Sequence, residues 1–302
     1  MFTATPLASA GVPTATVMDG TALRDETVAE IRSEIEAADS PPVCLATVLV
    51  GEDPPSQRYV RTKHRQAEAA GMLSRNVELR ASAGQAEVEE AVAELAADPG
   101  VHGILVQLPL PDGLDPDGVL GLIPVEKDVD GLTDRSLGRL VRGEPGLVPC
   151  TPLGVMRLLE RYDVPTRGTR AVVVGRSTLV GLPMVLLLAR KGVDATVTVA
   201  HSRTPDLAAV CREADILVAA AGQARLVSAD YVKAGAAVID VGVSRTADGI
   251  AGDVDFDSVA EVAGFVTPMP GGTGPMTVAC LLVNTLTAAR LQGALPDVVA
   301  AR

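Results

Sequence analysis

Short apolar runs rich in β-branched residues alternate along this chain with stretches of helical length, and Gly or Pro stands at most of the joints. Near-continuous apolar runs are typical of parallel strands covered on both faces. Strand–helix alternation over a whole chain indicates an α/β protein with doubly wound parallel sheets. The expected strands are Cys44–Val50, His102–Leu108, Arg170–Gly175, Ala195–Ala200, Ala214–Ala221 and Ala236–Val243. The expected helices are Thr21–Ala38, Gln57–Ala70, Gln85–Ala97, Leu153–Tyr162, Pro183–Lys191 and Met276–Gln292.

The 302 residues are enough for two domains of ordinary size. A boundary is expected near Pro149–Pro152, because a helix follows it and then a second β–α–β series begins. The last helix follows a Pro/Gly loop and is placed to cross back to the first domain. We therefore expect a flexible tail at 1–16, a first domain made of 17–152 plus 276–302, and a second domain at 153–275.

Composition excludes several classes of function. The net charge of -12 argues against nucleic acid as a partner, because phosphate binding needs clustered Lys and Arg. No apolar run reaches the roughly 18 residues of a membrane span, and residues 1–16 lack the basic residues of a secretory or transit segment. The four cysteines are widely spaced and only three histidines are present, so no metal site is expected. Reduced thiols are typical of a cytoplasmic protein.

A strand, a glycine turn and a helix start follow one another at Ala171–Gly181. Such a turn points backbone N–H groups and the positive end of the helix at a pyrophosphate. Only the outer glycines of a GxGxxG pattern remain, and glycine at a strand-to-helix turn can also be required by packing alone. The expected dinucleotide contacts are Gly175, Arg176, Ser177, Gly181 and Pro183.

The end of the next strand indicates which dinucleotide is bound. An acid is expected there for the ribose of NAD, and a basic residue for the extra phosphate of NADP. Here the strand ends in His201–Arg203 with no acid, so the pattern favours NADP held by Ser202 and Arg203. A solvated loop charge is the other interpretation of Arg203. Gly222 and Val243, at the following two strand ends, complete the expected cofactor contacts.

A YxxxK pattern joins Tyr59 to Lys63, and positions four apart share one face of a helix. The two side chains can therefore meet one substrate. Short-chain dehydrogenases use this pair for proton transfer, but there it follows the glycine turn, whereas here it precedes it. As a bare pattern, YxxxK is usually a helix surface, so its neighbours have to decide its meaning.

Those neighbours resemble the methylenetetrahydrofolate dehydrogenase/cyclohydrolase family. The similar motifs run in order from about Met18 to Leu291. They are Val50–Lys63, Gly103–Pro111, Lys127–Gly131, Gly138–Leu140, Pro149–Pro152, the turn Gly175–Pro183, and Pro270–Thr277. Two positions depart from the family pattern: Thr273 stands where Val is usual, and Ser136 where Asn is usual.

The resemblance implies a folate-binding catalytic domain, a Rossmann-like NADP-binding domain, a cleft between them, and a homodimer. It implies that Lys63 is essential to the cyclohydrolase step and that Gln107 hydrogen-bonds Lys63. It implies that Tyr59 stacks on or positions the folate and that Asp130 holds the pterin. Residues that line the substrate site would be Ser56, Pro109, Gly271 and Gly272. Arg176 and Ser202 would contact the NADP phosphate.

The chemistry of the residues agrees with these roles. Hydride transfer needs positioning rather than a base, whereas hydrolysis needs a group that exchanges protons, such as a lysine with a lowered pKa. Three alternatives remain: a family member with only the dehydrogenase, a non-catalytic NADP-binding regulator, and an unrelated amino- or hydroxy-acid dehydrogenase. The presence of both Lys63 and Gln107 argues against a family member with only the dehydrogenase. The full set, with Tyr59 and Asp130, argues against a non-catalytic regulator. The lack of a suitable acid–base residue near the glycine turn argues against an unrelated dehydrogenase.

Overall fold

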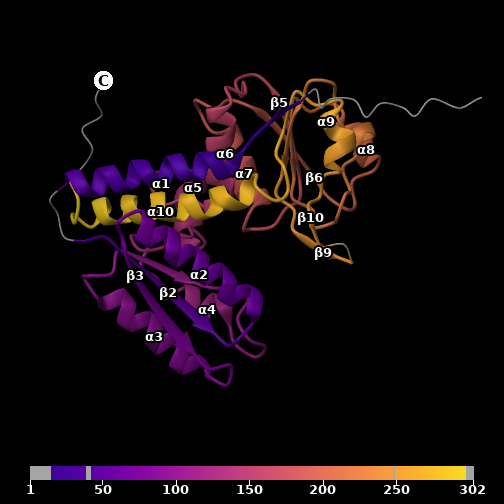
Figure 1. The fold of residues 1–302 in the computed structure, drawn as a ribbon. Coiled ribbons are helices and arrows are strands. Elements are labelled where there is room, and N and C mark those ends of the chain that lie inside the picture. Colours follow the sequence, from indigo (N-terminus) through magenta and orange to yellow (C-terminus); the bar gives the residue numbers. More distant parts are fainter. Residues whose placement is uncertain (1–14, 39–41, 248, 297–302) are drawn as a thin grey trace, which may run out of the picture.

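The computed structural model describes residues 15–38, 42–247 and 249–296, which form two α/β lobes with two long helices between them (Figure 1). The first lobe contains a parallel three-stranded sheet of order β3-β2-β4. Its strands are β2 (Cys44–Val50), β3 (Leu73–Leu79) and β4 (Gly103–Val106). Every residue of β2 is buried, because the central strand of this sheet is covered on both faces.

Helices connect these strands in the order expected for a parallel sheet. Helix α2 (Pro54–Ala69) joins β2 to β3, and α3 (Gln85–Ala97) joins β3 to β4. Two shorter helices follow the sheet, α4 (Pro116–Leu120) and α5 (Asp134–Arg142). The sequence did not predict β3, which lies at the edge of the sheet and has the polar, partly exposed sequence LSRNVEL.

The second lobe is a parallel six-stranded sheet of order β1-β11-β8-β7-β5-β6. Its strands are β5 (Arg170–Val174), β6 (Thr196–Ala200), β7 (Ile216–Ala219), β8 (Ala237–Asp240), β11 (Phe265–Val266) and β1 (Thr16–Val17). The order reverses at β5, which pairs with β6 on one side and β7 on the other. In doubly wound sheets, ligands bind at the carboxyl ends of strands beside such a reversal.

The remaining elements of this lobe are short. They are α7 (Gly181–Ala189), α8 (Leu207–Cys211), the 3-10 turn η1 (Ala229–Tyr231), the antiparallel pair β9 (Ser244–Thr246) and β10 (Gly249–Ala251), and α9 (Phe256–Ala260). The expected α/β class with parallel sheets is confirmed, and all six expected strands are present; β2 has the expected ends, and the other five differ by one to three residues at one or both ends.

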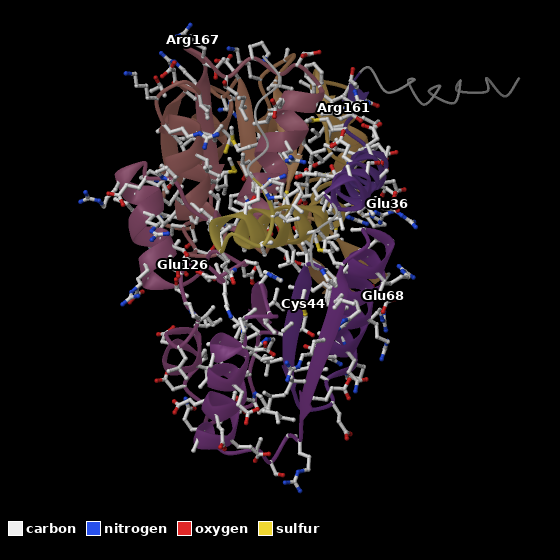
Figure 2. The ribbon with its side chains drawn as sticks, turned by 90° about the vertical axis from the view of Figure 1, so that its left-hand side faces the viewer. Glu36, Cys44, Glu68, Glu126, Arg161 and Arg167 are labelled. Atoms are coloured by element: carbon white, nitrogen blue, oxygen red, sulfur yellow. The ribbon has the colours of Figure 1, made fainter. Side chains whose placement is uncertain are left out.

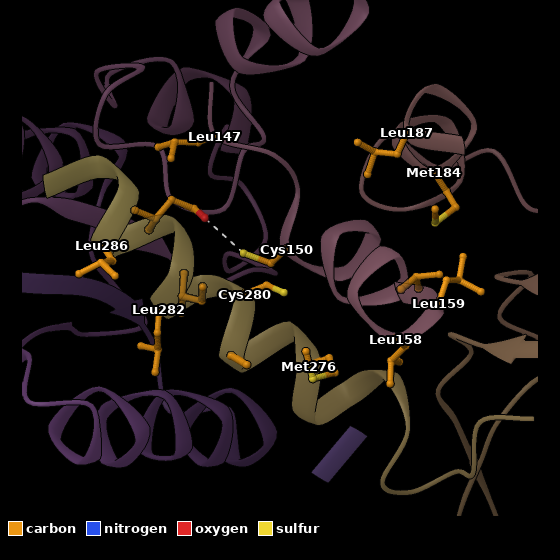
Figure 3. Packing of buried hydrophobic residues seen from close by; sticks show 14 of the residues in the cluster. Leu147, Cys150, Leu158, Leu159, Met184, Leu187, Met276, Cys280, Leu282 and Leu286 are labelled. Carbon is orange, nitrogen blue, oxygen red and sulfur yellow. Dashed lines mark hydrogen bonds between the residues drawn. The ribbon is translucent and has the colours of Figure 1, made fainter. Parts of the chain in front are cut away.

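Three helices join the lobes: α1 (Gly20–Ala37), α6 (Cys150–Arg161) and α10 (Thr273–Leu291). Helix α10 runs alongside α1 and lies between the two sheets (Figures 1 and 2). Its buried Met276 and Cys280 meet Leu158 and Leu159 of α6 in one continuous apolar core (Figure 3). Gly154 permits this contact, because a Cβ there would lie 2.9 Å from the Cβ of Met276.

One expectation about the chain start is wrong. Ala15 is buried, and Thr16–Val17 pair with β11, so an expected tail that reaches residue 16 is too long. A two-residue strand carries no periodic signal in the sequence. The rest of that tail, residues 1–14, lies outside the described residues. None of the helices in the described part of the chain combines the length and hydropathy that crossing a membrane requires.

Candidate active site

Helix α2 holds Tyr59 and Lys63 one turn apart, and its start is fixed by a capping carboxylate. Asp53 accepts hydrogen bonds from the backbone N–H of Ser56 at 2.9 Å and from its hydroxyl at 2.7 Å. Pro54 is the first helical residue, where the lack of an N–H costs little. The side chain of Ser56 is therefore buried in the helix cap, while Tyr59 is 51% exposed.

Lys63 and Gln107 are joined directly. The partly buried ammonium nitrogen of Lys63 donates to Oε1 of Gln107 at 3.0 Å. Gln107 follows the carboxyl end of β4, and its Nε2 donates to the carbonyl of Leu108 at 2.7 Å. Since the amide nitrogen is used by that carbonyl, the amide oxygen must face Lys63. Pro109 follows, exposed at the same end of the strand.

The loop Lys127–Gly131 places Asp130 opposite Lys63. Its other charged residues have structural roles: Lys127 donates to three carbonyls at the end of α3, and Asp128 accepts three backbone N–H groups from residues 131–133. Gly131 has a φ of 71°, and a Cβ there would meet the backbone of Val148 and Pro149 at 2.6 Å. Asp130 alone of the motif's charges interacts with Lys63.

Burial and mutual charge set the protonation of this pair. Desolvation lowers the pKa of Lys63, and the nearby Asp130 carboxylate partly opposes this. Desolvation raises the pKa of Asp130, and the ammonium of Lys63 opposes it. Both shifts favour neutral groups, so a proton can leave Lys63 more readily than it leaves an exposed lysine.

Cys150, at the start of α6, completes the cluster and was not among the expected site residues. Its thiol is buried and donates to the carbonyl of Val129 at 3.2 Å, directly before Asp130. Burial, with Asp130 nearby, raises the pKa of this thiol well above its ordinary value, so it stays protonated. The sequence placed Cys150 in the motif Pro149–Pro152, but the motif did not indicate that its thiol contacts the loop of Asp130.

The glycine turn lies on the other lobe, where β5 leads into α7. Gly175 has a φ of 135°, and a Cβ there would lie 2.2 Å from the carbonyl oxygen of Ala220. A Cβ at Gly181 would lie 2.4 Å from the carbonyl oxygen of Gly175. Both glycines are thus required by packing, and they also leave the turn without side chains where a pyrophosphate could approach.

Two exposed arginines lie at the same edge of the sheet as this turn. Gly175 donates its N–H to Ala200 at 2.9 Å, so the ends of β5 and β6 are adjacent. Arg176 and Ser177 follow β5, and Ser202 and Arg203 follow β6, all of them exposed. Pro183, in the first turn of α7, is buried. The exposed positive groups fit a phosphate better than they fit a hydroxyl pair.

Gly222 and Val243 follow β7 and β8, and a buried carboxylate supports the first of them. Asp253 accepts the N–H groups of Ala221 at 2.6 Å and Gly222 at 2.9 Å. Val243 is 53% exposed. Asp253 was not among the residues expected from the sequence, because a side chain that binds a distant backbone segment leaves no local pattern.

The loop before α10 contains Gly271 and Gly272. Gly271 accepts the N–H of Thr21 at 3.1 Å, which ties the loop to the start of α1. The departure at Thr273 has a structural consequence: its hydroxyl donates to the carbonyl of Asp240 at 2.7 Å and links α10 to the end of β8. The other departure, Ser136, is fully buried, and its backbone N–H donates to Thr133 at 3.2 Å.

A hollow of about 750 Å³ lies between the first lobe and the glycine turn. Leu132 and Thr133, just after Asp130, line one part of it, and Thr178 of the turn lines another. Within the described ranges, no group of three or more His, Cys, Asp and Glu side chains is arranged to hold a metal ion.

These features define a class: two-lobed α/β enzymes that use a dinucleotide on one lobe and a lysine–amide–carboxylate cluster on the other. Two family models match the chain. Residues 18–130 match the catalytic domain of tetrahydrofolate dehydrogenase/cyclohydrolase, and residues 149–293 match its NAD(P)-binding domain. The chain therefore belongs to the tetrahydrofolate dehydrogenase/cyclohydrolase family.

Individual relatives agree with the family assignment. The chain is 54% identical to "Bifunctional protein FolD 2" of Frankia alni, over 91% of this chain and 96% of that protein. Among solved structures it is similar to a bifunctional FolD enzyme from Campylobacter jejuni, with 42% identity, a TM-score of 0.87, and coverage of 92% and 99%. A Trypanosoma brucei FolD structure, complexed with NADP cofactor and inhibitor, has 41% identity, a TM-score of 0.87, and coverage of 92% and 98%.

Proposed function

We propose that this protein oxidises 5,10-methylenetetrahydrofolate to the 5,10-methenyl form with NADP and then hydrolyses it to 10-formyltetrahydrofolate. The observation that supports the hydrolytic step is the hydrogen bond from Lys63 to the neutral amide of Gln107, with the charge of Asp130 acting on the same lysine. The glycine turn between β5 and α7 supports the dehydrogenase step. Family membership and relatives that are named as bifunctional support the same conclusion.

The dehydrogenase step depends on positioning. Bound NADP would accept the hydride, and the cationic product is stabilised by the two nitrogens that flank the bridging carbon, so no protein base is required. The residues that would hold the cofactor lie at the carboxyl ends of adjacent strands of the second sheet or in the first turn of α7. They are Gly175, Arg176, Ser177, Gly181, Pro183, Ser202, Arg203, Gly222 and Val243.

Hydrolysis requires proton exchange, which we assign to Lys63. Water attacks the cationic methenyl carbon and loses a proton to the neutral amine, which gives a neutral carbinol. The resulting ammonium protonates the ring nitrogen that leaves, and the carbinol hydroxyl gives its proton back to the amine as the C–N bond breaks and the formyl C=O forms, so that one proton is released to solvent overall. Desolvation prepares the amine for this role by lowering its pKa. The amide of Gln107 orients the lysine in either charge state, because its oxygen accepts from an amine as well as from an ammonium.

Asp130 is the proposed anchor for the pterin. A pterin amide with its exocyclic amine offers adjacent donors, and one carboxylate can accept two of them. Tyr59 supplies the exposed aromatic surface one helical turn from Lys63. Lining roles are proposed for Ser56, Pro109, Gly271 and Gly272, although the hydroxyl of Ser56 already binds Asp53.

Organisation and context follow from the family. We propose a folate-binding domain of 17–152 plus 276–302, an NADP-binding domain of 153–275, a homodimer, and a cytoplasmic location. All four cysteines, Cys44, Cys150, Cys211 and Cys280, are buried free thiols. A reduced compartment is consistent with such thiols.

One assay tests the proposed activity. Purified protein is incubated with methylenetetrahydrofolate and NADP, and NADPH and 10-formyltetrahydrofolate are measured in the same sample. We expect both products in equal amounts. NADPH with accumulated methenyltetrahydrofolate would instead identify a monofunctional dehydrogenase. The absence of both products would indicate an NADP-binding protein without this catalysis.

A further inference from the structure

Asn284 of helix α10 contacts the loop that carries Asp130, although 154 positions separate the two residues in the sequence. The Asn284 side chain is buried, with 4% of its surface exposed. Its Nδ2 donates to the carbonyl of Val129 at 2.8 Å and to the carbonyl of Val148 at 2.8 Å. Both donor hydrogens of this amide are therefore used to join two backbone segments that lie side by side.

The two segments joined by Asn284 are the two sides of the proposed pterin anchor. The carbonyl of Val129 belongs to the peptide group whose nitrogen is that of Asp130, so fixing this carbonyl fixes the plane from which the Asp130 side chain extends. The same carbonyl accepts the thiol of Cys150 at 3.2 Å. Gly131, on the other side of Asp130, packs against Val148 and Pro149.

A second amide of the same helix region fixes the beginning of the loop. Nε2 of Gln292 donates to the carbonyl of His102 at 2.8 Å and to that of Glu126 at 3.2 Å. Helix α10 and the residue that follows it thus hold both ends of the segment 126–130. Only the Asn284 contact is next to Asp130, whereas the Gln292 contact lies four residues before it.

We propose that Asn284 is a positioning residue for the folate substrate, acting through Asp130. This inference rests on the proposed function, in which Asp130 accepts the pterin donors. Without the amide, the carbonyls of Val129 and Val148 lose a buried donor, and the peptide before Asp130 can rotate. The carboxylate then meets the substrate at a changed angle, while the dinucleotide residues on the other lobe keep their geometry.

The test compares Asn284→Leu with Gln292→Leu, two variants that each replace a buried or half-buried amide by an apolar side chain. Steady-state kinetics are measured for both reactions, with NADP and folate varied separately. For Asn284→Leu we expect KM for the folate substrate to rise about ten-fold in both reactions, with KM for NADP unchanged. For Gln292→Leu we expect both KM values within two-fold of wild type and a lower unfolding midpoint.

The outcomes separate the inference from the proposed function. A folate KM that is unchanged in Asn284→Leu, or raised equally in both variants, overturns the positioning role, because it leaves only a structural contribution. If Asn284→Leu does not fold, Asn284→Ser, which retains one donor, is judged by the same folate and NADP values. If the wild-type protein does not turn over folate, the proposed function itself is overturned. If the wild type is active and the Asn284 variant has an unchanged folate KM, only the positioning role is overturned.

Discussion

Replacing Gln107 by glutamate should suppress hydrolysis by holding Lys63 in its charged form. The new carboxylate would stand where Oε1 now accepts from Lys63 at 3.0 Å. At an effective dielectric constant near 20, the attraction between two unit charges 3.0 Å apart is about 5.5 kcal/mol. That energy corresponds to about four pH units in the pKa of Lys63. Desolvation of the added carboxylate opposes this rise in the pKa of Lys63, and we expect roughly half of the rise to remain.

The expected result is a selective loss. An upward displacement of about two pH units lowers the fraction of neutral Lys63 near pH 7 up to about 100-fold, and cyclohydrolase activity should fall in proportion. Because the pKa is raised, the lost rate should return as pH increases, whereas the dehydrogenase rate should change little. Gln107→Leu is the control, since it removes the hydrogen bond to Lys63 without adding charge.

Hydrolysis of methenyltetrahydrofolate is followed from pH 6 to pH 9, after subtraction of the spontaneous reaction. The reasoning is refuted if Gln107→Glu retains the wild-type pH profile. It is also refuted if the glutamate and leucine variants lose equal activity at every pH, because the charge would then have no effect of its own.

Three further predictions concern the second lobe. Burial raises the pKa of Asp240 to about 6, against hydrogen bonds from backbone N–H groups, so the folded state binds the proton more tightly than the unfolded state. The contribution of Asp240 to the free energy of unfolding should therefore fall by roughly 3 kcal/mol as pH rises from about 4 to about 6. Urea unfolding at several pH values should show this fall in wild type and not in Asp240→Asn. Free energies of unfolding that run parallel against pH in the two proteins would contradict it. Arg203→Ala should reduce the preference for NADP over NAD at least about ten-fold in kcat/KM, the size expected for one charge-assisted contact of about 1.5 kcal/mol, and an unchanged ratio would identify Arg203 as a solvated loop charge. Gly175→Ala should weaken NADP binding and lower the melting temperature, because its Cβ would lie 2.2 Å from the oxygen of Ala220; unaltered binding by calorimetry would show that the turn can relax.

The elements that could be predicted from the sequence are those with a strong local pattern. Strand β2 was predicted with its observed ends because it is a central strand, apolar throughout. Strand β3 was missed because it lies at the sheet edge, where one face and one side are open to water and polar residues such as Arg75 and Glu78 are tolerated. Strands β1 and β11 are too short to have any period.

For the site, the motifs named candidate residues more completely than they specified the contacts between them. Lys63 and Gln107 belong to separate motifs, and the parallel arrangement of β2 and β4 brings them together as the resemblance implied. The supports behind the site could not be predicted. Asn284 and Asp253 both act by binding distant backbone groups, which any polar side chain of suitable reach could do, so their identity contains no signal without the fold.

Lys63→Gln gives the most direct measurement of whether a desolvated amine at this position exchanges protons during hydrolysis. The glutamine keeps a polar side chain of similar reach but cannot gain or lose a proton near neutral pH. With methylenetetrahydrofolate and NADP, we predict that NADPH still forms while methenyltetrahydrofolate accumulates and disappears only at its spontaneous rate. Conversion to 10-formyltetrahydrofolate at the wild-type rate would show that the amine of residue 63 is not the group that moves the proton.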